Sequence, residues 1–556
     1  MHFSDDEWTA KTIGRFYTKP FTAAFVTELV LQHPIETVLD PSCGNGVFLI
    51  EAANRLRALG AARGSTLTGI DLDEIACSEA AAVIKWNAPE LHAEIINRDF
   101  FSVEPDEIGG VSAVLGNPPF VRYQIFSGKV RDRALRCAED AGVSLSRQSN
   151  AWAPFVIHAI SFLQPGGSLG LILPGELLHA AYAAPVLRHI FTHFEQVRVL
   201  TFDAPLFPAL DVHAIALVAS GAGGTCKEFQ IVRVRNSNGI GPWTSIGHTI
   251  VENPLYADSK KKIPRVPEYY LPQKIRGIYR KIQSSVIASS VGQVVSVDIG
   301  YVTGDHNFFH LTKEGIRRWD VPVKFRVRTL RSARNMKCSV FTEGDWRRLR
   351  DQLGASYLLR IPAASSAERL ERIKPYLAEG IRRRVNRRYQ CRSRNPWYSV
   401  RGVRIADGFL TSMSSGPPKL VMNEAGVAAS NNMHVITRRE HVDSSTFKAI
   451  TASWYSTYTM TSTLVEGHVL GGGLRKLEPS EAERVGVLVP SDPDLLKALA
   501  RLLPEVDRFL RESRIQEASG KVDHLLLDEF LGLSQEEITT LAEFANASRA
   551  GLSSRS

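Results

Sequence analysis

The sequence predicts an α/β protein whose first 245 residues form a doubly wound, mostly parallel sheet. Short apolar runs alternate there with segments of helical period, and several of these runs end in an acid or a turn residue. A glycine-rich turn also joins the first run to the first helical segment. Strands separated by helices form parallel sheets, which bind ligands at the carboxyl ends of their strands.

The expected elements follow in order along this part of the chain. Strands are favoured where Val, Ile, Leu and Thr gather between Gly, Pro, Asp or Asn, and helices where apolar residues recur every three to four positions. We expect strands at residues 36–40, 66–71, 94–98, 111–115, 168–174, 197–202 and 214–219. We expect helices at residues 47–59, 74–87 and 151–163.

The remaining chain has a different character. At 556 residues the protein is too long for one ordinary core. Residues 253–270 are rich in Pro, Lys and Tyr, residues 271–490 mix short β-like runs with Gly, Pro and Arg, and amphipathic helical patterns follow. We therefore expect an α/β domain at 1–245, a linker at 246–270, a mixed α+β domain at 271–490 and a helical C-terminal segment at 491–556.

The overall composition is that of an ordinary globular protein, with 44% apolar and 22% charged residues. The longest uncharged run, 148–175, is broken by QPGG, so we expect no membrane span. The six cysteines form no CxxC pair and show no metal-ligand spacing. This pattern favours reduced cysteines, no bound metal and a cytoplasmic location.

A basic segment stands out in the second half. The net charge of +9 and the pI near 9.2 permit an acidic partner. Residues 381–404, IRRRVNRRYQCRSRNPWYSVRGVR, hold nine arginines, three aromatics and no acid. The segment is either a basic surface loop or a surface that contacts nucleic-acid phosphates and bases.

Polar residues follow the first three expected strands. The turn DPSCGNG (40–46) lets a ligand approach the backbone and the amino end of the next helix, but it matches neither the P-loop nor GxGxxG. Asp71 can accept hydrogen bonds from a ribose diol, and Asp99 with Phe100 can hold an adenine by its amino edge and its face. The alternatives are turn or capping aspartates and a core phenylalanine.

The fourth strand ends in LGNPPFVRY (115–123). Two successive prolines cannot continue a central strand, so they predict a stiff loop that presents an amide, free carbonyls and a ring.

In this order the motifs resemble the gamma-class DNA adenine-N6 methyltransferases, which use S-adenosylmethionine. The likeness covers most of residues 12–220 and rests on GRFYTKPFTAAFVTELV, VLDPSCGNGVFLIEA, GID, RDFF, GNPPF, FLQPGGSLGLILP and FPALDVHAIALV. It implies a Rossmann-like methyltransferase sheet followed by a target recognition domain that binds double-stranded DNA. It also implies a modification role, with a possible cognate restriction endonuclease acting on the same site.

The resemblance assigns roles to individual residues. The implied cofactor-binding residues are Thr18, Pro20, Asp40, Pro41, Cys43, Gly44, Gly46, Asp71, Leu72, Asp99 and Phe100. The implied catalytic residues are Asn117, Pro118, Pro119, Phe120 and Phe207. For DNA contact we expect Arg382, Arg383, Arg384, Arg392, Arg394, Trp397, Arg475 and Lys476. A flexible loop is the alternative for the glycines at 471–473 that precede the last two.

The expected chemistry begins with a weak nucleophile, because the lone pair of the adenine amine is delocalised into the ring. The Asn117 side-chain oxygen and the Pro118 carbonyl can accept its two hydrogens and favour a pyramidal nitrogen. Phe120 and Phe207 would sandwich the base, which must leave the duplex stack to react. A neutral thioether leaves, so positioning and electrostatic complementarity supply most of the catalysis.

Other activities are less consistent with the sequence. Cytosine-C5 methylation would need a cysteine directly after a proline, and the sequence has none. The tetrad NPPF (117–120) begins with Asn rather than the Ser or Thr more usual in cytosine-N4 enzymes. The isolated DSK at 258–260 does not predict a nuclease. An RNA adenine or protein glutamine-N5 methyltransferase, and a catalytically inactive DNA-binding specificity subunit, remain as alternatives.

Overall fold

The computed structural model divides the chain into two units, residues 1–271 and 272–556. It describes residues 18–61, 63–178, 180–202, 206–207, 214–236, 243–253, 266–333, 336–363, 365, 370–414, 416–469 and 474–553. No helix among these residues is both long enough and apolar enough to cross a bilayer.

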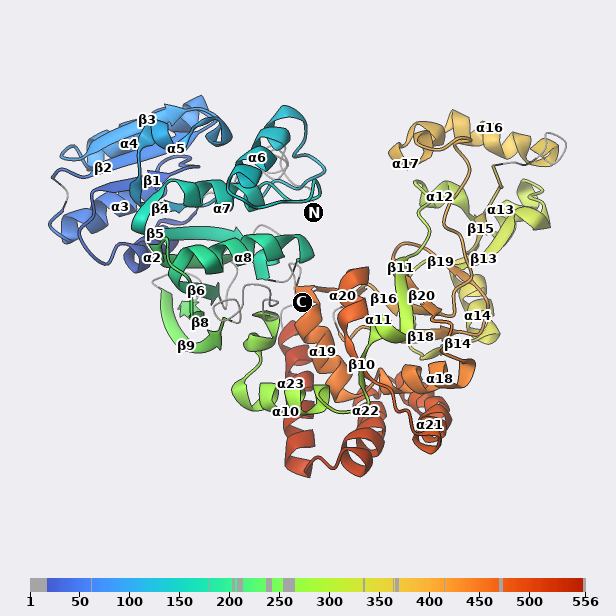
Figure 1. The fold of residues 1–556 in the computed structure, drawn as a ribbon. Coiled ribbons are helices and arrows are strands. Elements are labelled where there is room, and N and C mark those ends of the chain that lie inside the picture. The colour runs from blue at the N-terminus through green and yellow to red at the C-terminus, as the bar shows by residue number, and fades with distance from the viewer. Residues whose placement is uncertain are drawn as a thin grey trace. The chain divides into compact units, whose positions relative to one another are not determined.

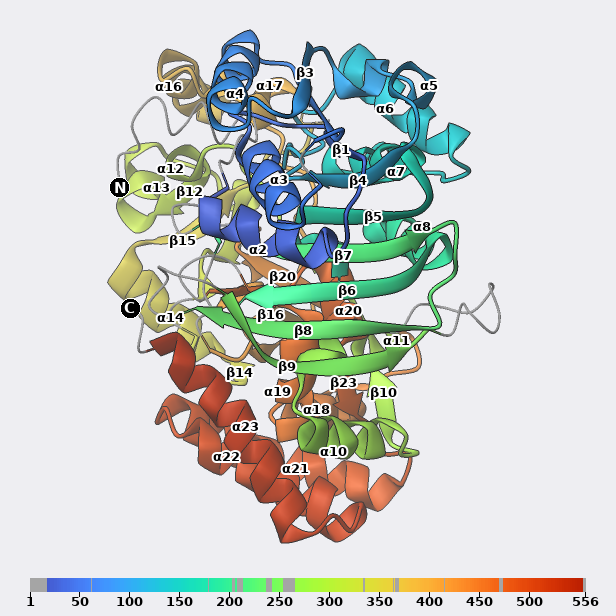
Figure 2. The same cartoon turned by 90° about the vertical axis from the view of Figure 1, so that its left-hand side faces the viewer.

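The first unit is built on a nine-stranded sheet, seen face-on in Figure 2, in the order β3-β2-β1-β4-β5-β7-β6-β8-β9. Neighbouring strands from β3 to β5 are parallel, whereas β7 runs antiparallel to both β5 and β6. This arrangement confirms the predicted α/β class. The strands are β1 (Thr37–Asp40), β2 (Thr66–Asp71), β3 (His92–Asn97), β4 (Val111–Gly116), β5 (Leu163–Pro174), β6 (Phe194–Phe202), β7 (Ala214–Ala222), β8 (Glu228–Asn236) and β9 (Trp243–Glu252).

Helices cover both faces of this sheet (Figure 1). Successive strand residues point to opposite faces, so Val38 packs in one apolar core and Leu39 in the other. Helices α2 (Pro20–Val30), α3 (Val47–Ala58) and α4 (Glu74–Asn87) contribute to the first core, whereas α7 (Trp152–Ser161) and α8 (Ala184–His193) contribute to the second. The unit also contains α5 (Pro105–Ile108) and α6 (Gly128–Asp140).

The last two strands correct the expected boundary of this unit. Strand β9 spans residue 245, where the first domain was expected to end, and it pairs along its whole length with β8. The sequence of β8, EFQIVRVRN, alternates between buried and more exposed positions, a period-2 signal that was missed. Strand β5 begins at Leu163, whereas a start at residue 168 was expected. It includes the QPGG segment, where its register against β4 is irregular.

The described residues of the second unit form four smaller sheets. Their strand orders are β11-β20-β16-β18-β14, β12-β15-β13-β19, β17-β22-β21 and β10-β23. The strands are β10 (Ala288–Ser290), β11 (Val295–Ile299), β12 (His310–Thr312), β13 (Arg326–Leu330), β14 (Val340–Phe341), β15 (Ala355–Leu359), β16 (Gly408–Thr411), β17 (Met413–Ser414), β18 (Leu420–Asn423), β19 (Ala428–Ala429), β20 (Met433–Arg438), β21 (His468–Val469), β22 (Arg475–Lys476) and β23 (Gly486–Leu488).

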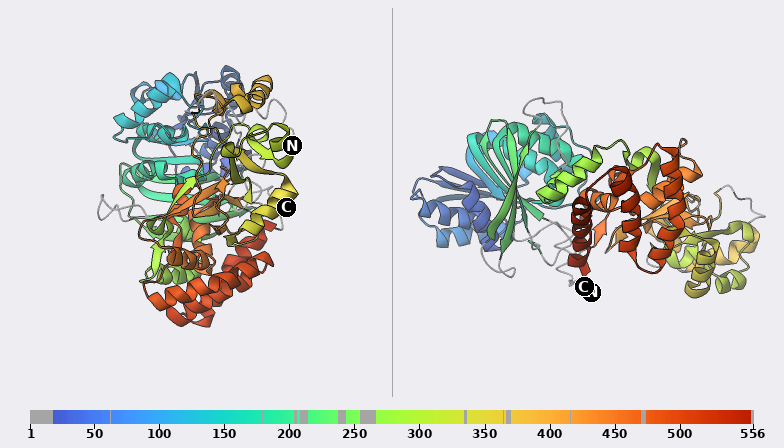
Figure 3. Two further views of the ribbon diagram at one scale, coloured as in Figure 1. Left: turned by 90° about the vertical axis from the view of Figure 1, so that its right-hand side faces the viewer. Right: turned by 90° about the horizontal axis from the view of Figure 1, so that it is seen from below.

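The C-terminal helices pack inside this second unit rather than forming a separate tail (Figure 3). Helix α21 contacts α18, and α23 contacts both α19 and α10. The helices are α10 (Gln273–Gln283), α11 (Val291–Val294), α12 (His306–Phe309), α13 (Lys313–Arg318), α14 (Glu343–Leu353), α16 (Lys374–Arg382), α17 (Tyr389–Arg392), α18 (Ser444–Ser453), α19 (Thr457–Glu466), α20 (Pro479–Arg484), α21 (Pro493–Arg511), α22 (Ile515–Asp523) and α23 (Gln535–Ser553).

Candidate active site

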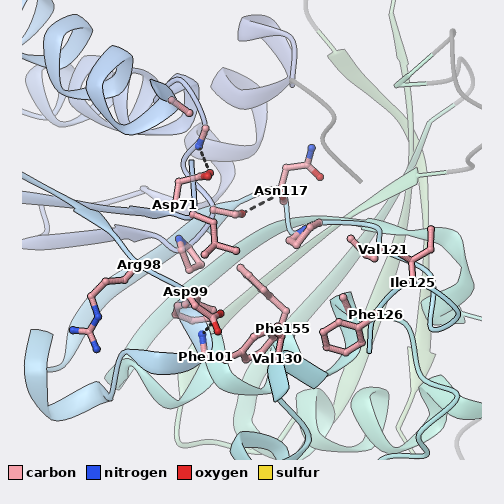
Figure 4. A pocket seen from close by; sticks show the side chains of 18 of the residues that line it. Asp71, Arg98, Asp99, Phe101, Asn117, Val121, Ile125, Phe126, Val130 and Phe155 are labelled. Atoms are coloured by element: carbon pink, nitrogen blue, oxygen red, sulfur yellow. Dashed lines mark hydrogen bonds between the residues drawn. The ribbon is translucent and has the colours of Figure 1, made fainter. Parts of the chain in front are cut away.

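A cavity of about 500 Å³ lies at the carboxyl ends of strands β1 to β4 in the first unit (Figure 4). The loops after these four strands all contribute to its lining. The predicted site residues that line it are Pro41, Gly44, Asp71, Leu72, Asp99, Phe100, Asn117 and Pro119. Residues that lie far apart in the sequence therefore share one space, as parallel-strand topology requires.

The glycine-rich turn and Asp71 form one side of the cavity. Gly44 and Gly46 have φ angles of 50° and 84°, in the left-handed region that glycine adopts without strain. The backbone N–H of Gly44 donates to Asp71 Oδ2 at 2.9 Å, and that of Asp73 donates to Oδ1 at 2.9 Å. These bonds orient the Asp71 carboxylate, whose remaining lone pairs can accept hydrogen bonds from a ligand.

Asp40 lies below the cavity and is only 1% exposed. Its Oδ1 accepts from the backbone N–H of Ser42 at 3.1 Å. A Cβ at Gly116 would lie 2.7 Å from that oxygen, so the residue before Asn117 must be glycine to leave room for the carboxyl group. Burial raises the pKa of Asp40 to about 8, with the nearby Asp71 charge adding to the effect. Asp40 therefore supports the turn through Ser42, and contact between Asp40 and a ligand stays a prediction.

We predict that Asp40→Asn flattens the dependence of folding stability on pH. Because the pKa of Asp40 rises from 3.8 to about 8 on folding, its contribution is fully present below pH 3.8 and is lost as the pH rises through 8. The loss is at most about 1.4 kcal/mol per pH unit, and an amide does not titrate. Urea unfolding at pH 5 and pH 8.5 tests this, with the exposed Asp132→Asn as control. Equal pH dependence in wild type and Asp40→Asn would show the assignment to be wrong.

Four further predicted cofactor residues, Thr18, Pro20, Cys43 and Gly46, lie outside the cavity lining. Thr18 is buried just before α2, and Pro20 is the first residue of that helix. The backbone N–H of Cys43 donates to Ile70 O at 2.9 Å, which ties the turn to β2. A Cβ on Gly46 would lie 3.1 Å from Ala80 Cβ, so this glycine permits close packing of α3 on α4. The contacts of Cys43 and Gly46 thus fix the shape of the turn from outside the cavity.

The loop after β4 forms the opposite rim of the cavity. Ser42 Oγ donates to the backbone oxygen of Asn117 at 3.1 Å, so the first turn holds the start of the NPPF loop. Phe120 and Phe207 contact each other edge to face, with ring centroids 6.3 Å apart and planes at 83°. The two rings therefore touch each other directly and are not parallel, and their role as a base sandwich stays a prediction. Residues 208–213, within the FPALDVHAIALV motif that begins at Phe207, lie outside the described residues.

Asp99 and Phe100 contact both the cavity and the core. Asp99 Oδ1 accepts from the backbone N–H of Phe101 at 3.2 Å, and Oδ2 pairs with Arg133 Nη1 at 2.7 Å. The Phe100 ring is 4% exposed, and its centroid lies 4.7 Å from that of Phe155. The ligand and core interpretations of Phe100 are therefore compatible, because one part of the ring packs inward while another lines the cavity.

The sequence interpretation missed the apolar wall of the cavity. Val121, Ile125, Phe126 and Val130 follow the NPPF loop, and Phe155 comes from α7 (Figure 4). Apolar residues within the otherwise polar segment 121–133 were the available signal. In the described part of the chain, no group of three or more His, Cys, Asp or Glu side chains is arranged to hold a metal ion.

The basic segment of the second unit, residues 381–404, begins at the end of α16 and includes α17. Arg382, Arg383, Arg384 and Arg392 are exposed, as expected of residues that contact DNA. Arg382 pairs with Glu379 at 2.7 Å, whereas no ion pair involving the other three occurs among the described residues. The Arg392 guanidinium lies 5.4 Å from the ring centroid of Tyr389, which is 71% exposed. This cation–aromatic pair presents both charge and a flat face to solvent.

Other predicted DNA contacts are engaged within the unit. Arg394 donates to the backbone oxygens of Thr303 and Val302 at 2.9 and 2.6 Å, and partial burial lowers its pKa. Both terminal nitrogens of Arg394 thus bind a loop of the same unit, and its contact with DNA stays a prediction. Other members of the set also have partners within the unit. Trp397 packs against Phe308 and Phe309, Lys476 pairs with Glu478, and Arg475 is partly buried in β22. The glycines at 471–473 lie outside the described residues.

Comparisons with known proteins match both units. Residues 3–228 match the family model "N-6 DNA Methylase", and residues 265–527 match "Type II methyltransferase M.Eco57I, C-terminal domain". Type II methyltransferase M.AccI of Acinetobacter calcoaceticus is 21% identical over 547 residues, 94% of each chain. M.XamI of Xanthomonas campestris pv. amaranthicola is 21% identical over 494 residues, covering 86% of this chain and 85% of its own.

A solved structure supports the fold over most of the chain. The cryo-EM structure of a DrdV–DNA complex has a TM-score of 0.51 and 10% identity, over 91% of this chain and 58% of that one. The two family models follow each other along nearly the whole sequence. With an N-6 DNA methylase match over its first part and a type II methyltransferase C-terminal match over its second, the chain is an N6-adenine DNA methyltransferase of the type II restriction-modification kind.

Proposed function

We propose that the protein transfers a methyl group from S-adenosylmethionine to N6 of an adenine that is flipped out of duplex DNA at a specific site. The supporting observation is the cavity, in which Asp71 at the end of β2 and Asn117 after β4 line one space. We also propose that this reaction is the modification step of a restriction-modification system, as the names of the relatives suggest.

The cavity suits S-adenosylmethionine in size and in the chemistry of its lining. Its volume of about 500 Å³ lies in the range of small-molecule sites, and the lining combines apolar walls with a few polar groups. The Asp71 carboxylate suits a ribose diol, Asp99 suits an adenine amino group, and the Gly44 turn admits a ligand close to the backbone. When bound, the cofactor supplies an electrophilic methyl group on a sulfonium.

The NPPF loop acts on the other reactant. The Asn117 side-chain oxygen and the Pro118 carbonyl accept hydrogen bonds from the two amine hydrogens of the target adenine, which localises the nitrogen lone pair. Phe120 and Phe207, once separated, hold the base by its faces. The stiff loop keeps both acceptors in place, so little reorganisation is needed as charge develops on the nitrogen.

A labelling experiment tests the proposal directly. Purified full-length protein is incubated with tritiated S-adenosylmethionine and, separately, duplex DNA, RNA and protein extract, and modified adenines in the DNA are mapped by long-read sequencing. We expect N6-methyladenine in one short sequence context. Label in RNA or in protein glutamine would favour the alternative methyltransferases, and the absence of cofactor binding by calorimetry would favour an inactive specificity subunit.

We predict that the combined change Arg382→Gln, Arg383→Gln and Arg384→Gln weakens DNA binding and makes it less sensitive to salt. For every phosphate that an arginine no longer neutralises, the slope of log K against log salt becomes shallower by about 0.9. Fluorescence anisotropy with duplex DNA between 50 and 200 mM salt measures both quantities. Arg501→Gln, an exposed arginine in α21, is the matched control. A triple variant with the wild-type slope would show that α16 does not contact DNA.

A further inference from the structure

Four polar side chains form a hydrogen-bonded cluster behind the NPPF loop, and the reaction described above gives them no role. Asn150 Nδ2 donates to Glu176 Oε2 at 2.8 Å and to the Tyr182 hydroxyl at 2.9 Å. Trp152 Nε1 donates to the same hydroxyl at 3.1 Å, and that hydroxyl donates to Glu176 Oε2. The Tyr182 hydroxyl thus uses its hydrogen and both lone pairs, a complete set of bonds.

The cluster reaches the loop through Asn150. Its side-chain Oδ1 accepts from the backbone N–H of Tyr123 at 2.9 Å. The next residue, Ala151, donates its backbone N–H to Val121 O at 3.0 Å. Because Glu176 and Tyr182 take both amide hydrogens of Asn150, the amide cannot rotate without losing these bonds, and its oxygen stays directed at the loop.

The fold explains why these groups meet. Strands β4 and β5 are parallel neighbours, so the NPPF loop after β4 and the 3₁₀ turn Gly175–Leu178 after β5 leave adjacent ends of the sheet. Asn150 precedes α7, which packs against β5. At its start the loop is held by Ser42 Oγ on the Asn117 oxygen. The NPPF loop is therefore fixed at its start by Ser42 of the DPSCGNG turn and at its end by the cluster.

We propose that Asn150 is a positioning residue for methyl transfer, held by Glu176, Tyr182 and Trp152, which sets the orientation of the NPPF loop. This inference rests on the proposed function, since it assigns the loop to the target adenine. Two prolines stiffen the segment 117–120, so a shift at Val121 or Tyr123 is carried to Asn117 rather than absorbed. Displacement of a catalytic group by about 1 Å can lower a rate about 10²-fold.

Burial keeps the Tyr182 hydroxyl protonated. Burial and the adjacent Glu176 carboxylate raise the pKa of Tyr182 well above its ordinary value, so the hydroxyl keeps its proton at neutral pH. The Trp152 side chain is fully buried. If the cluster only stabilised the unit, loss of the Asn150 side chain would not change the NPPF loop. If the cluster positions the loop, the same loss changes the orientation of the loop.

The test compares Asn150→Ala with Asn150→Asp and with the double variant Asn150→Asp/Glu176→Gln, all in the full-length protein. Three quantities are measured: the single-turnover methylation rate at saturating cofactor and duplex DNA, the cofactor Kd by calorimetry, and hydrogen exchange at the Tyr123 amide. We expect Asn150→Ala to lower the rate about 10²-fold, to change Kd far less, and to speed exchange at Tyr123.

The double variant provides the rescue. Asn150→Asp alone keeps an acceptor for Tyr123 but places two carboxylates together, so we expect a slow enzyme. Adding Glu176→Gln exchanges the amide and the carboxylate between the two positions, so the bonds can form again and most of the rate should return. Arg147→Gln, which breaks an exposed ion pair with Asp132, is the control and should retain the wild-type rate and exchange.

Particular results would overturn the inference. These are a wild-type rate in Asn150→Ala, unchanged exchange at Tyr123, or equal losses in rate and cofactor affinity without rescue by the double variant. Wild-type protein that methylates no adenine in DNA would instead refute the proposed function. The exchange measurement then still decides whether Asn150 holds the loop.

Discussion

Asn117→Ala should lower the rate of adenine methylation by about 10²- to 10³-fold, the range found when one preorganised hydrogen-bonding group is removed from a reacting centre. The variant loses the side-chain acceptor, so the amine lone pair stays delocalised in the ring. The backbone bond from Ser42 Oγ to the Asn117 oxygen does not depend on the side chain, so the loop keeps this attachment. Single-turnover assays with tritiated cofactor and duplex DNA measure the effect.

A control separates chemistry from folding in this experiment. Asn87→Ala removes an exposed asparagine at the end of α4, whose Nδ2 donates to Val83 O, and should leave the rate unchanged. Calorimetry should show the same cofactor Kd for Asn117→Ala and wild type. Full turnover in Asn117→Ala would refute the proposed polarisation of the amine.

Asp71→Ala is the second variant with a large expected effect, here on cofactor affinity. The carboxylate is held by the N–H groups of Gly44 and Asp73 at the rim of the cavity. Its removal deletes the acceptor for a ribose diol and leaves the Gly44 N–H without this partner. Hydrogen bonds to charged groups contribute about 1.5–3 kcal/mol, so the Kd should rise about 10- to 100-fold.

Two companion variants define the effect at Asp71. Asp71→Asn keeps one acceptor oxygen and should give an intermediate Kd. Glu74→Gln, in the first turn of α4, changes a nearby charge that does not line the cavity and should bind with wild-type affinity. An unchanged Kd in Asp71→Ala, measured by calorimetry, would contradict the placement of the cofactor in this cavity.

The order of the motifs along the chain predicted which loops meet in space. The DPSCGNG turn, Asp71, Asp99 and the NPPF loop were each expected at a strand end, and the sheet brings them to one cavity. The gamma-class assignment remains a prediction, because it depends on motif order. The apolar wall and the Asn150 cluster were not predicted, since they come from segments without a recognised motif.

Side-chain partners explain why the DNA contacts were harder to predict. Arg392 and Arg394 are two positions apart and look alike in the sequence, yet Arg392 is exposed beside Tyr389 while Arg394 donates to Val302 and Thr303. Those partners lie about ninety residues away along the chain. A pattern of charge thus predicts a basic surface, but not which arginines are available to bind DNA.

The sequence by itself determined the α/β class, the order of the strand-end motifs and the resemblance to adenine-N6 DNA methyltransferases, because local periodicity and short motifs encode these features. Only the tertiary structure decided that Asp40 is buried, that Phe120 and Phe207 meet edge to face, and that Asn150 accepts a hydrogen bond from the Tyr123 N–H just after the NPPF loop. Burial and long-range hydrogen bonds depend on which segments become neighbours in space, and no local pattern specifies that.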